Sequence, residues 1–361
     1  MRLTRPTGEQ VEVDARPTGP EDSGRPIIIL EGATSSPENR SFNPAANDKS
    51  GIISVAARFR NAPEGSRLRW SSPEAGALQV DTPNSGRTRV RGLRPGRRDL
   101  DVELLDAGGT RIASMKLRLS VPQYVRIVED PSFNTFLADS HLSPVKNPMI
   151  AHVKQTAEHL LRRANVRLFW QVGGMNEQVP AHVPAASVMT VTLRNTDPGG
   201  ALGRTNQPVA PDRFDEAIDL FPDHYDDQDA IDVDTETQAL ILELESSLAS
   251  DPGLEQLGAK VFGRLIGETM AHEVVHGLIA DLVNPGHATD PYHHIPAVAN
   301  DLMNPGGDRV FRQRTGMENT AQVSPVQPSH YVDHGLATIG GLQPVTQALV
   351  DSHFPVAGAM P

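Results

Sequence analysis

The sequence predicts a multidomain protein in which an all-β sandwich is followed by an α+β domain. Short runs that alternate apolar with polar residues, separated by turn residues, occupy 26–122. From residue 123 to residue 361, segments with helical spacing of apolar residues are interleaved with strand-like segments. A length of 361 residues is sufficient for two or three domains.

The first part of the chain consists of an arm and a sandwich. Residues 1–25 are polar and rich in Pro and Gly, so we expect a flexible arm. About seven short strands after it are typical of an antiparallel sandwich. We expect these strands at 27–30, 51–59, 67–72, 77–80, 87–93, 99–109 and 112–121. We expect Trp70 to pack in the core rather than to bind a ligand.

The stretch VRGLRPGRRDLDVELLDAGG (90–109) resembles the late strands of bacterial immunoglobulin-like domains. The resemblance covers about 95 residues and implies an Ig-like sandwich for 26–122. Such a domain would act as a spacer or would bind another protein.

The second part, 123–361, is expected to fold as one α+β domain. Apolar residues at helical spacing predict a helix over 148–165, and a long helical region begins near Asp234 and breaks at Asp251-Pro-Gly. The expected order is strand 123–130, helix 148–165, strands 166–174 and 186–195, the helix from Asp234, and a last helix from about Leu254 to Leu282.

Composition excludes several classes of function. A net charge of −12 argues against non-specific nucleic-acid binding. No run of 18 apolar residues exists, so no membrane-spanning segment is expected. The absence of cysteine excludes disulfides and thiolate metal ligands. The N-terminus lacks the apolar core of a standard secretory signal, so three possibilities stay open: a cytoplasmic protein, export by another route, or a leader missing from this chain.

Acidic residues are concentrated in 212–236, which holds eleven of them and a single basic residue, Arg213. A calcium-binding loop or a trap for a basic substrate would explain them, but EF-hand spacing is missing. We therefore favour a solvated acidic loop.

The clearest chemical pattern is H-E-x-x-H in the sequence HEVVH (272–276). His272 and His276 are four residues apart on a predicted helix, so both imidazoles can reach one metal ion. Glu273 points about 100° away from His272, where it can act as general base towards water at the metal. The pattern alone also occurs by chance in helices that bind no metal.

A catalytic zinc ion usually has three protein ligands, and the third is not obvious here. The turn Asn284-Pro285-Gly286 can swing the chain back so that His287 faces the metal. The candidates are His287, Asp290, His293, His294 and Asp301. Glu318 is a weaker candidate because its surroundings do not predict a helix. A second pair at helical spacing, His330 and His334, lacks a Glu after its first His and is a poor zinc site.

Three motifs together, HEVVH (272–276), GHATD (286–290) and DLMNPGG (301–307), resemble the metzincin-like zinc peptidases. The resemblance implies that His272, His276 and His287 bind Zn²⁺, that Glu273 is the catalytic base, and that Met303 is the Met-turn residue below the metal. It also implies an edge segment, for which 199–208 is the candidate.

The spacing departs from that of the family. The usual motif would place Gly at 279 and His at 282, where this chain has Ile279 and Leu282, and His287 follows five residues late. We expect the helix to be about one turn longer before the Asn-Pro-Gly break.

The sequence therefore predicts a zinc-dependent endopeptidase that hydrolyses peptide bonds of a protein or peptide substrate. The alternative is a structural, adhesion or secreted-particle component, in which the metal only stabilises the fold and no proteolysis occurs. A toxin or effector that attacks a foreign protein is a third, less supported possibility.

Overall fold

The computed structural model describes residues 2–4, 10–12, 25–31, 40–41, 49–195, 201–205, 217–225, 233–279, 292–321 and 326–353. The fold contains both β-sheets and helices and divides into two compact units. Unit 1 comprises the chain up to Gln123 together with Pro180–Ser187, and unit 2 comprises Tyr124–Val179 and Val188–His353.

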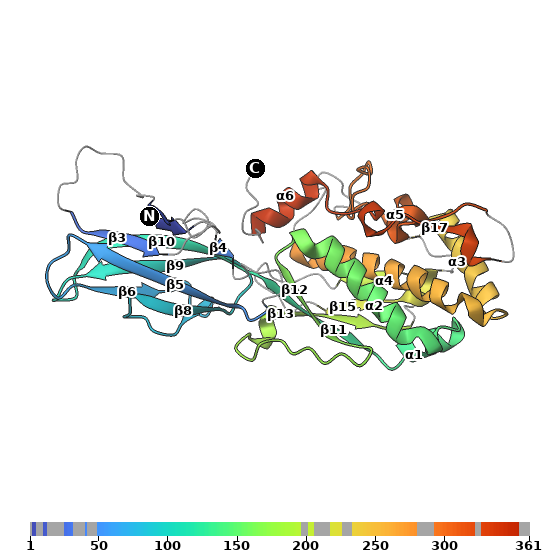
Figure 1. The fold of residues 1–361 in the computed structure, drawn as a ribbon, viewed down its shortest axis with the longest axis horizontal. Helices are drawn as coiled ribbons and strands as arrows, with labels where there is room; N and C mark the ends of the chain where they lie inside the picture. Colours follow the sequence, from blue (N-terminus) through green and yellow to red (C-terminus); the bar gives the residue numbers. More distant parts are fainter. Residues whose placement is uncertain are drawn as a thin grey trace. The chain divides into compact units, whose positions relative to one another are not determined.

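Unit 1 is built of two β-sheets (Figure 1). The first has the order β2-β1-β3-β5-β8-β7 and the second β4-β10-β9-β6. The short strands β1 and β2, which lie in the predicted arm, join the edge of the first sheet. The strands are β1 (Arg2–Thr4), β2 (Gln10–Glu12), β3 (Ile27–Glu31), β4 (Arg40–Ser41), β5 (Ile52–Arg60), β6 (Arg67–Ser71), β7 (Leu78–Val80), β8 (Arg87–Gly92), β9 (Gly96–Leu105) and β10 (Arg111–Val121).

Alternating side chains of these strands form the core of unit 1. Every second residue of β8 is buried, as the period of two requires for a sheet with one covered face. Trp70 on β6 is 1% exposed, and its Nε1 donates to the carbonyl of Ser85 at 2.7 Å. The expectation that Trp70 is a core residue is confirmed.

Unit 2 contains a five-stranded sheet with the order β12-β11-β13-β15-β14. β11, β13 and β15 are parallel to one another, and β14 runs antiparallel to β15 at the edge. The edge segment expected within 199–208 contains this strand. The strands are β11 (Gln123–Glu129), β12 (Val166–Gln171), β13 (Val188–Leu193), β14 (Gly203–Thr205) and β15 (Ala217–Leu220), with a separate hairpin of β16 (Met317–Asn319) and β17 (Tyr331–Asp333).

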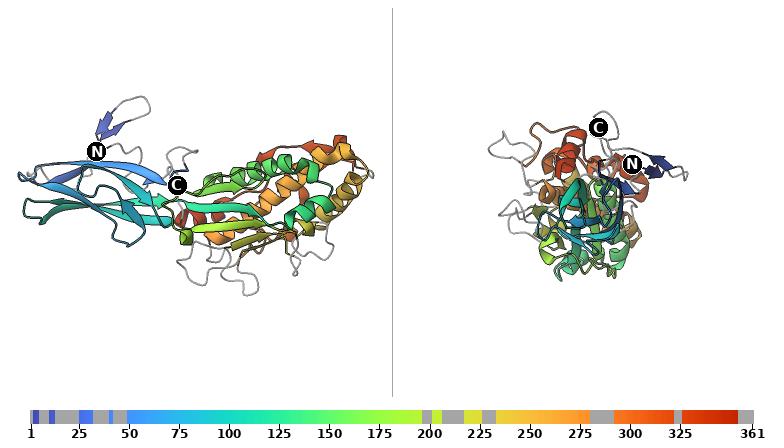
Figure 2. Two further views of the ribbon diagram at one scale, coloured as in Figure 1. Left: turned by 90° about the horizontal axis from the view of Figure 1, so that it is seen from below. Right: turned by 90° about the vertical axis from the view of Figure 1, so that its left-hand side faces the viewer.

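Two helices of unit 2, α2 (Lys146–Leu160) and α4 (Glu255–Leu278), lie side by side along the sheet (Figures 1 and 2). Gly263 and Gly267 of α4 make this close contact possible. A Cβ at Gly263 would lie 2.6 Å from the carbonyl oxygen of Met149, and one at Gly267 2.7 Å from that of Val153. The helices are α1 (Phe133–Asp139), α2 (Lys146–Leu160), α3 (Thr235–Leu248), α4 (Glu255–Leu278), α5 (Phe311–Thr315) and α6 (Pro344–His353).

Helix ends follow local chemistry. α3 begins after Asp234, whose carboxylate accepts from the backbone N–H groups of Glu236 and Thr237. The predicted end of the last long helix at Leu282 is wrong, because α4 ends at Leu278. Ile279 leaves the helical region with φ −116° and ψ 58°. Helix α4 therefore ends four residues before the predicted boundary, and residues 280–291, which include Asn-Pro-Gly, lie outside the described residues.

Two further expectations concern partly described regions. Of the acidic stretch 212–236, the structure describes 217–225 and 233–236, and the remainder lies outside the described residues. Among the described residues, no helix combines the length and the apolar character needed to cross a membrane.

Candidate metal centre

Helix α4 presents two histidines on one face. His272 and His276 are 4% and 9% exposed, and their Nε2 atoms lie 2.9 Å apart. The two rings are almost perpendicular, with an interplanar angle of 89°. The spacing of four residues therefore brings the two imidazole nitrogens together, as the motif predicts.

A third histidine joins this pair from the segment after α4. The Nε2 of His293 lies 3.3 Å from the Nε2 of His272, and its ring stacks on that of His272 at a centroid distance of 5.2 Å. One ligand nitrogen from each of His272, His276 and His293 lies within 4.8 Å of the others. His287, which the family resemblance implies as a ligand, lies outside the described residues, as does Asp290.

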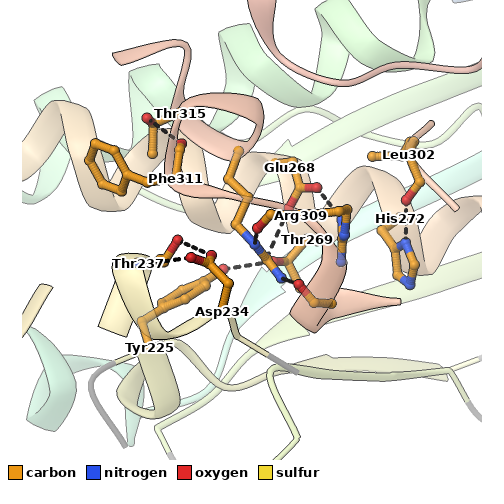
Figure 3. Close-up of polar contacts among 12 residues, drawn as sticks. Tyr225, Asp234, Thr237, Glu268, Thr269, His272, Leu302, Arg309, Phe311 and Thr315 are labelled. Carbon is orange, nitrogen blue, oxygen red and sulfur yellow. Dashed lines mark hydrogen bonds and ion pairs between the residues drawn. The ribbon is translucent and has the colours of Figure 1, made fainter. Parts of the chain in front are cut away.

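The orientation of His272 is set by a backbone carbonyl. Its Nδ1 lies 2.6 Å from the carbonyl oxygen of Leu302 (Figure 3). Since a carbonyl can only accept, Nδ1 carries the proton, and Nε2 keeps its lone pair facing His276 and His293. This is the usual arrangement for a histidine that binds a metal through Nε2.

Burial keeps both helix histidines neutral. Burial lowers the pKa of His276 to about 3, and the charges of His293 and Arg309 act in the same direction. Burial, followed by the charge of Arg309, lowers the pKa of His272 well below its usual value. Neutral imidazoles retain the lone pairs that a metal ion needs, so His272 and His276 can bind one, and together with His293 they form a group that could hold a metal ion.

Glu273 is held against the edge strand β14. Thr205 Oγ1 donates to the carboxylate Oε2 at 2.6 Å and also lies 2.9 Å from the backbone carbonyl of Glu273. A Cβ on Gly203 would lie 2.7 Å from Cγ and 2.8 Å from Oε1 of Glu273. Glycine at 203 therefore leaves the space in which the carboxylate lies, and Thr205 orients it.

The turn at 301–304 supports the histidines from the other side. Asp301 is 1% exposed, and its carboxylate accepts from the backbone N–H of Met303 and the hydroxyl of Thr346. Met303 is fully buried and directly follows Leu302, the residue whose carbonyl orients His272. The backbone N–H of His294 donates to the carbonyl of Met303, which ties the segment carrying His293 to this turn.

A buried ionic cluster lies beside the centre. Glu268, one turn before His272 on α4, pairs with the guanidinium group of Arg309 (Figure 3). It also pairs with the guanidinium group of Arg314. Arg314 also donates to the backbone carbonyls of Gly306 and Arg309, at 2.8 and 3.0 Å. Burial lowers the pKa of Arg309 to about 10, so its side chain is still positively charged at neutral pH.

These groups meet in one cleft of about 260 Å³. Its walls include His272, Glu273, His276, His293, Arg309 and Thr205. A carboxylate, three imidazoles and a cation thus face the same space. This combination can bind a metal ion, water and a polar substrate group together.

The other candidate residues have structural partners instead. His294 Nε2 lies 2.8 Å from Thr346 Oγ1, and the carboxylate of Asp301 is used within its turn. Glu318 lies on β16 and pairs with Arg312 and His334 on the surface. His330 is also removed from the centre, since it caps the short helical turn that follows Gln327.

Several residues of the site were not identified from the sequence. Gly203, Thr205, Arg309 and Arg314 belong to no motif. Glu268 carries one usable signal, because it precedes His272 by four residues on a predicted helix and therefore shares its face. The contacts of Arg309 and Thr205 join segments that are distant in the sequence.

Comparisons with known proteins do not identify a family. No family model and no curated protein matches the chain. Among solved structures, the solution structure of the PKD domain of the KIAA 1837 protein is 12% identical, covering 23% of this chain and 78% of that chain, with a TM-score of 0.17. A protein assigned as an α-galactosidase from Bacteroides fragilis is 13% identical, with 58% and 42% coverage and a TM-score of 0.19. A sialyltransferase from Photobacterium damsela is 13% identical, with 45% and 32% coverage and a TM-score of 0.16.

Proposed function

We propose that this protein is a zinc-dependent endopeptidase whose metal centre lies in the cleft of unit 2. One observation carries the proposal. Ring nitrogens of three histidines converge within 4.8 Å, and the Glu273 carboxylate from α4 faces the same cleft. Neither a buried structural cluster nor a surface metal site needs a carboxylate base beside its ligands.

The nitrogen donor set fits zinc. Tetrahedral zinc with Zn–N distances of about 2.0–2.1 Å places its ligand nitrogens roughly 3.3–3.4 Å apart. The nitrogens of His272 and His293 are 3.3 Å apart, within this range, whereas those of His272 and His276 are 2.9 Å apart, so that pair would have to separate slightly when zinc binds. Zn²⁺ bound there would lower the pKa of water and polarise a substrate carbonyl.

The residues of the chain then have distinct roles. Glu273, held by Thr205, takes a proton from the attacking water and later delivers it to the nitrogen of the leaving amine. The Leu302 carbonyl holds His272 in the tautomer that binds metal, and Met303 anchors this turn in the core.

The arrangement of unit 2 supports a metzincin-like interpretation. The expected order of strand, helix, strands, edge segment and metal-bearing helix is found in β11, α2, β12, β13, β14 and α4. The two sheets of unit 1 support an Ig-like sandwich that acts as a spacer or binds another protein.

The decisive experiment compares wild type with Glu273→Gln for zinc content and peptide cleavage. We expect one zinc per chain in both proteins and a loss of about 10²–10⁴-fold in cleavage rate for the variant. A wild type without zinc, or a variant that cleaves as fast as wild type, would refute the proposal. A zinc-loaded wild type that cleaves no peptide but unfolds when chelator removes the metal would instead favour the structural alternative.

The third ligand is tested separately with His293→Ala and His287→Ala. We propose His293 for this role because it is the described histidine that reaches the pair. The family resemblance predicts His287. Both variants are exposed to a chelator concentration at which wild type keeps its zinc. The variant that loses zinc under this condition lacks the third ligand.

A further inference from the structure

The cleft contains a positive charge that the proposed ligands and base do not use. Two guanidinium groups, those of Arg309 and Arg314, share the single carboxylate of Glu268. Both guanidiniums are buried, so two positive charges share one carboxylate within this cluster, and Glu273 across the cleft is a further negative charge that acts on Arg309. Burying positive charge in this way is costly unless an anion is brought to it.

Arg309 is the member of this cluster that faces the cleft. It lines the cleft together with His272 and Glu273, whereas Arg314 is fully buried and bonded to backbone carbonyls. Its Nε is buried and has no hydrogen-bond partner among the described residues. Figure 3 shows Arg309 between Glu268 and His272.

The position of Arg309 is fixed rather than adaptable. Arg314 donates to the carbonyl of Arg309 and to that of Gly306, so it holds the backbone from which Arg309 projects. Glu268 holds the guanidinium itself through Nη1. A donor fixed before the reaction costs no reorganisation when charge develops next to it, which is the requirement for transition-state stabilisation.

We infer that Arg309 is the anion-binding group of the cleft and takes the oxyanion that forms on the scissile carbonyl. The inference rests on the proposed peptidase function. The oxygen of water bonds to the carbonyl carbon, Glu273 takes the water proton, and the carbonyl π pair moves onto oxygen next to Arg309. When the C–N bond breaks, this pair restores the carbonyl and the proton on Glu273 goes to the leaving nitrogen, giving an amine and a carboxylic acid, which then loses the second water proton to solvent and becomes a carboxylate.

The test uses the full chain as wild type, Arg309→Met and Arg309→Lys. Arg312→Met is the matched control, because Arg312 lies nearby on α5 but has a side chain that is 51% exposed and pairs with Glu318. Three quantities are measured: zinc affinity by chelator competition, acetate affinity of the Co²⁺-loaded protein by its visible spectrum, and the separate values of kcat and KM for peptide cleavage.

For Arg309→Met we expect kcat to fall by about 10²-fold with KM nearly unchanged. Acetate binding should weaken by about tenfold, since a charged hydrogen-bond donor is lost. Zinc should bind more tightly, by about tenfold, because a like charge near the ion is removed. Arg312→Met should match wild type in all three.

Unchanged kcat and acetate affinity in Arg309→Met would overturn the inference. A raised KM with unchanged kcat would also overturn it, since Arg309 would then bind only the ground state. If Arg309→Met does not fold, Arg309→Lys is the deciding variant. A lysine cannot contact Glu268 and the substrate at the same time as a guanidinium does, so kcat should fall by about tenfold. An Arg309→Lys protein with the kcat of wild type would contradict the inference. If wild type cleaves no peptide, the proposed function fails, while the acetate and zinc measurements still test whether Arg309 binds anions.

Discussion

The two units differ in whether they bury charged side chains. Among the described residues of unit 1, the buried polar side chains are uncharged, namely Thr88, Ser120, Gln123 and Ser187. Unit 2 buries charged or titratable groups, including Glu268, His272, Glu273, His276, Asp301, Arg309 and Arg314. Because burying such groups costs free energy, a fold keeps them where they do something that apolar residues cannot.

The contrast extends to ion pairs. In unit 1 the pairs lie on the surface, as between Arg69 and Glu103 or Arg91 and Asp81. In unit 2 the pairs of Glu268 are almost inaccessible to water. Both units bury an apolar core, and unit 2 adds to it a few buried polar contacts that are each costly to break.

The sharpest way to test this contrast is to remove one carboxylate from each unit. Glu268→Ala leaves two buried guanidiniums without the carboxylate that they share, so we expect unit 2 to lose about 3–5 kcal/mol of unfolding free energy. Glu103→Ala removes a surface partner and should cost unit 1 about 0.2–1 kcal/mol.

The chain provides a reporter for each unit in this experiment. Its two tryptophans, Trp70 in unit 1 and Trp170 in unit 2, are both buried. Urea unfolding followed by fluorescence in Trp70→Phe and Trp170→Phe backgrounds then measures each unit separately. Equal losses in the two units would contradict the comparison.

A second prediction concerns the turn below the histidines. Met303→Ala should destabilise unit 2 by about 2–5 kcal/mol, because it leaves a cavity in the core. Met303→Leu should cost less than about 1.5 kcal/mol, since it nearly conserves volume. If Met303→Ala unfolds at the wild-type urea midpoint, Met303 does not anchor the turn.

Acid should destabilise the two units over different pH ranges in the metal-free protein. The pKa of His276 falls on folding from 6.5 to about 3, and that of His272 shifts in the same direction. The unfolded chain therefore binds more protons between these values. Unit 2 loses stability as pH falls below 6.5, by about 1.4 kcal/mol per pH unit for each histidine.

Unit 1 should respond mainly at lower pH. Hydrogen bonds from Arg91 and Arg69 lower the pKa values of Asp81 and Glu103, so their contribution is present above about pH 4.5 and is lost below it. His182 in unit 1 also has a lowered pKa, but it is only partly buried and adds a smaller loss. Urea midpoints at pH 7 and pH 5 should therefore shift more for Trp170 than for Trp70, and the reverse order would refute this account.

The smallest predicted effect is on the orientation of the base. Thr205→Val removes the hydroxyl that donates to Glu273 and should lower kcat by about tenfold, equivalent to one hydrogen bond to a charged group. Thr190→Val is the control, because Thr190 lies on the same sheet and bonds to Arg126 instead. A similar loss of activity in both variants would assign the effect to the sheet rather than to Glu273.

Local patterns in the sequence predicted those features of the fold and the site that depend on residues close together in the sequence. The alternation in β8 and the spacing of His272 and His276 both follow from the geometry of one element. The end of α4 was placed too late because the turn signal at Asn284-Pro285-Gly286 was taken as the end of the helix, whereas the helix stops after Leu278.

The rest of the site depends on contacts between distant segments. Arg309 and Glu268 are 41 residues apart in the sequence, and Thr205 and Glu273 are 68 residues apart. Such pairings arise from how helices and strands pack, so no periodicity within either segment reports them. His293 could be proposed as a ligand only as one of several histidines, because its approach to α4 depends on the path of the chain after the helix.

Helix α4 fixes the spacing of four groups of the centre, since Glu268, His272, Glu273 and His276 all lie within nine consecutive positions. Deleting one residue between Glu268 and His276 would rotate the groups on either side of the deletion by about 100° relative to each other. The turn between β9 and β10 would absorb the same deletion by a local change of loop. A library of single-residue deletions should therefore lose metal retention most strongly within this helix. The number of residues between Glu268 and His276 is then a stricter requirement than the identity of the residues between them.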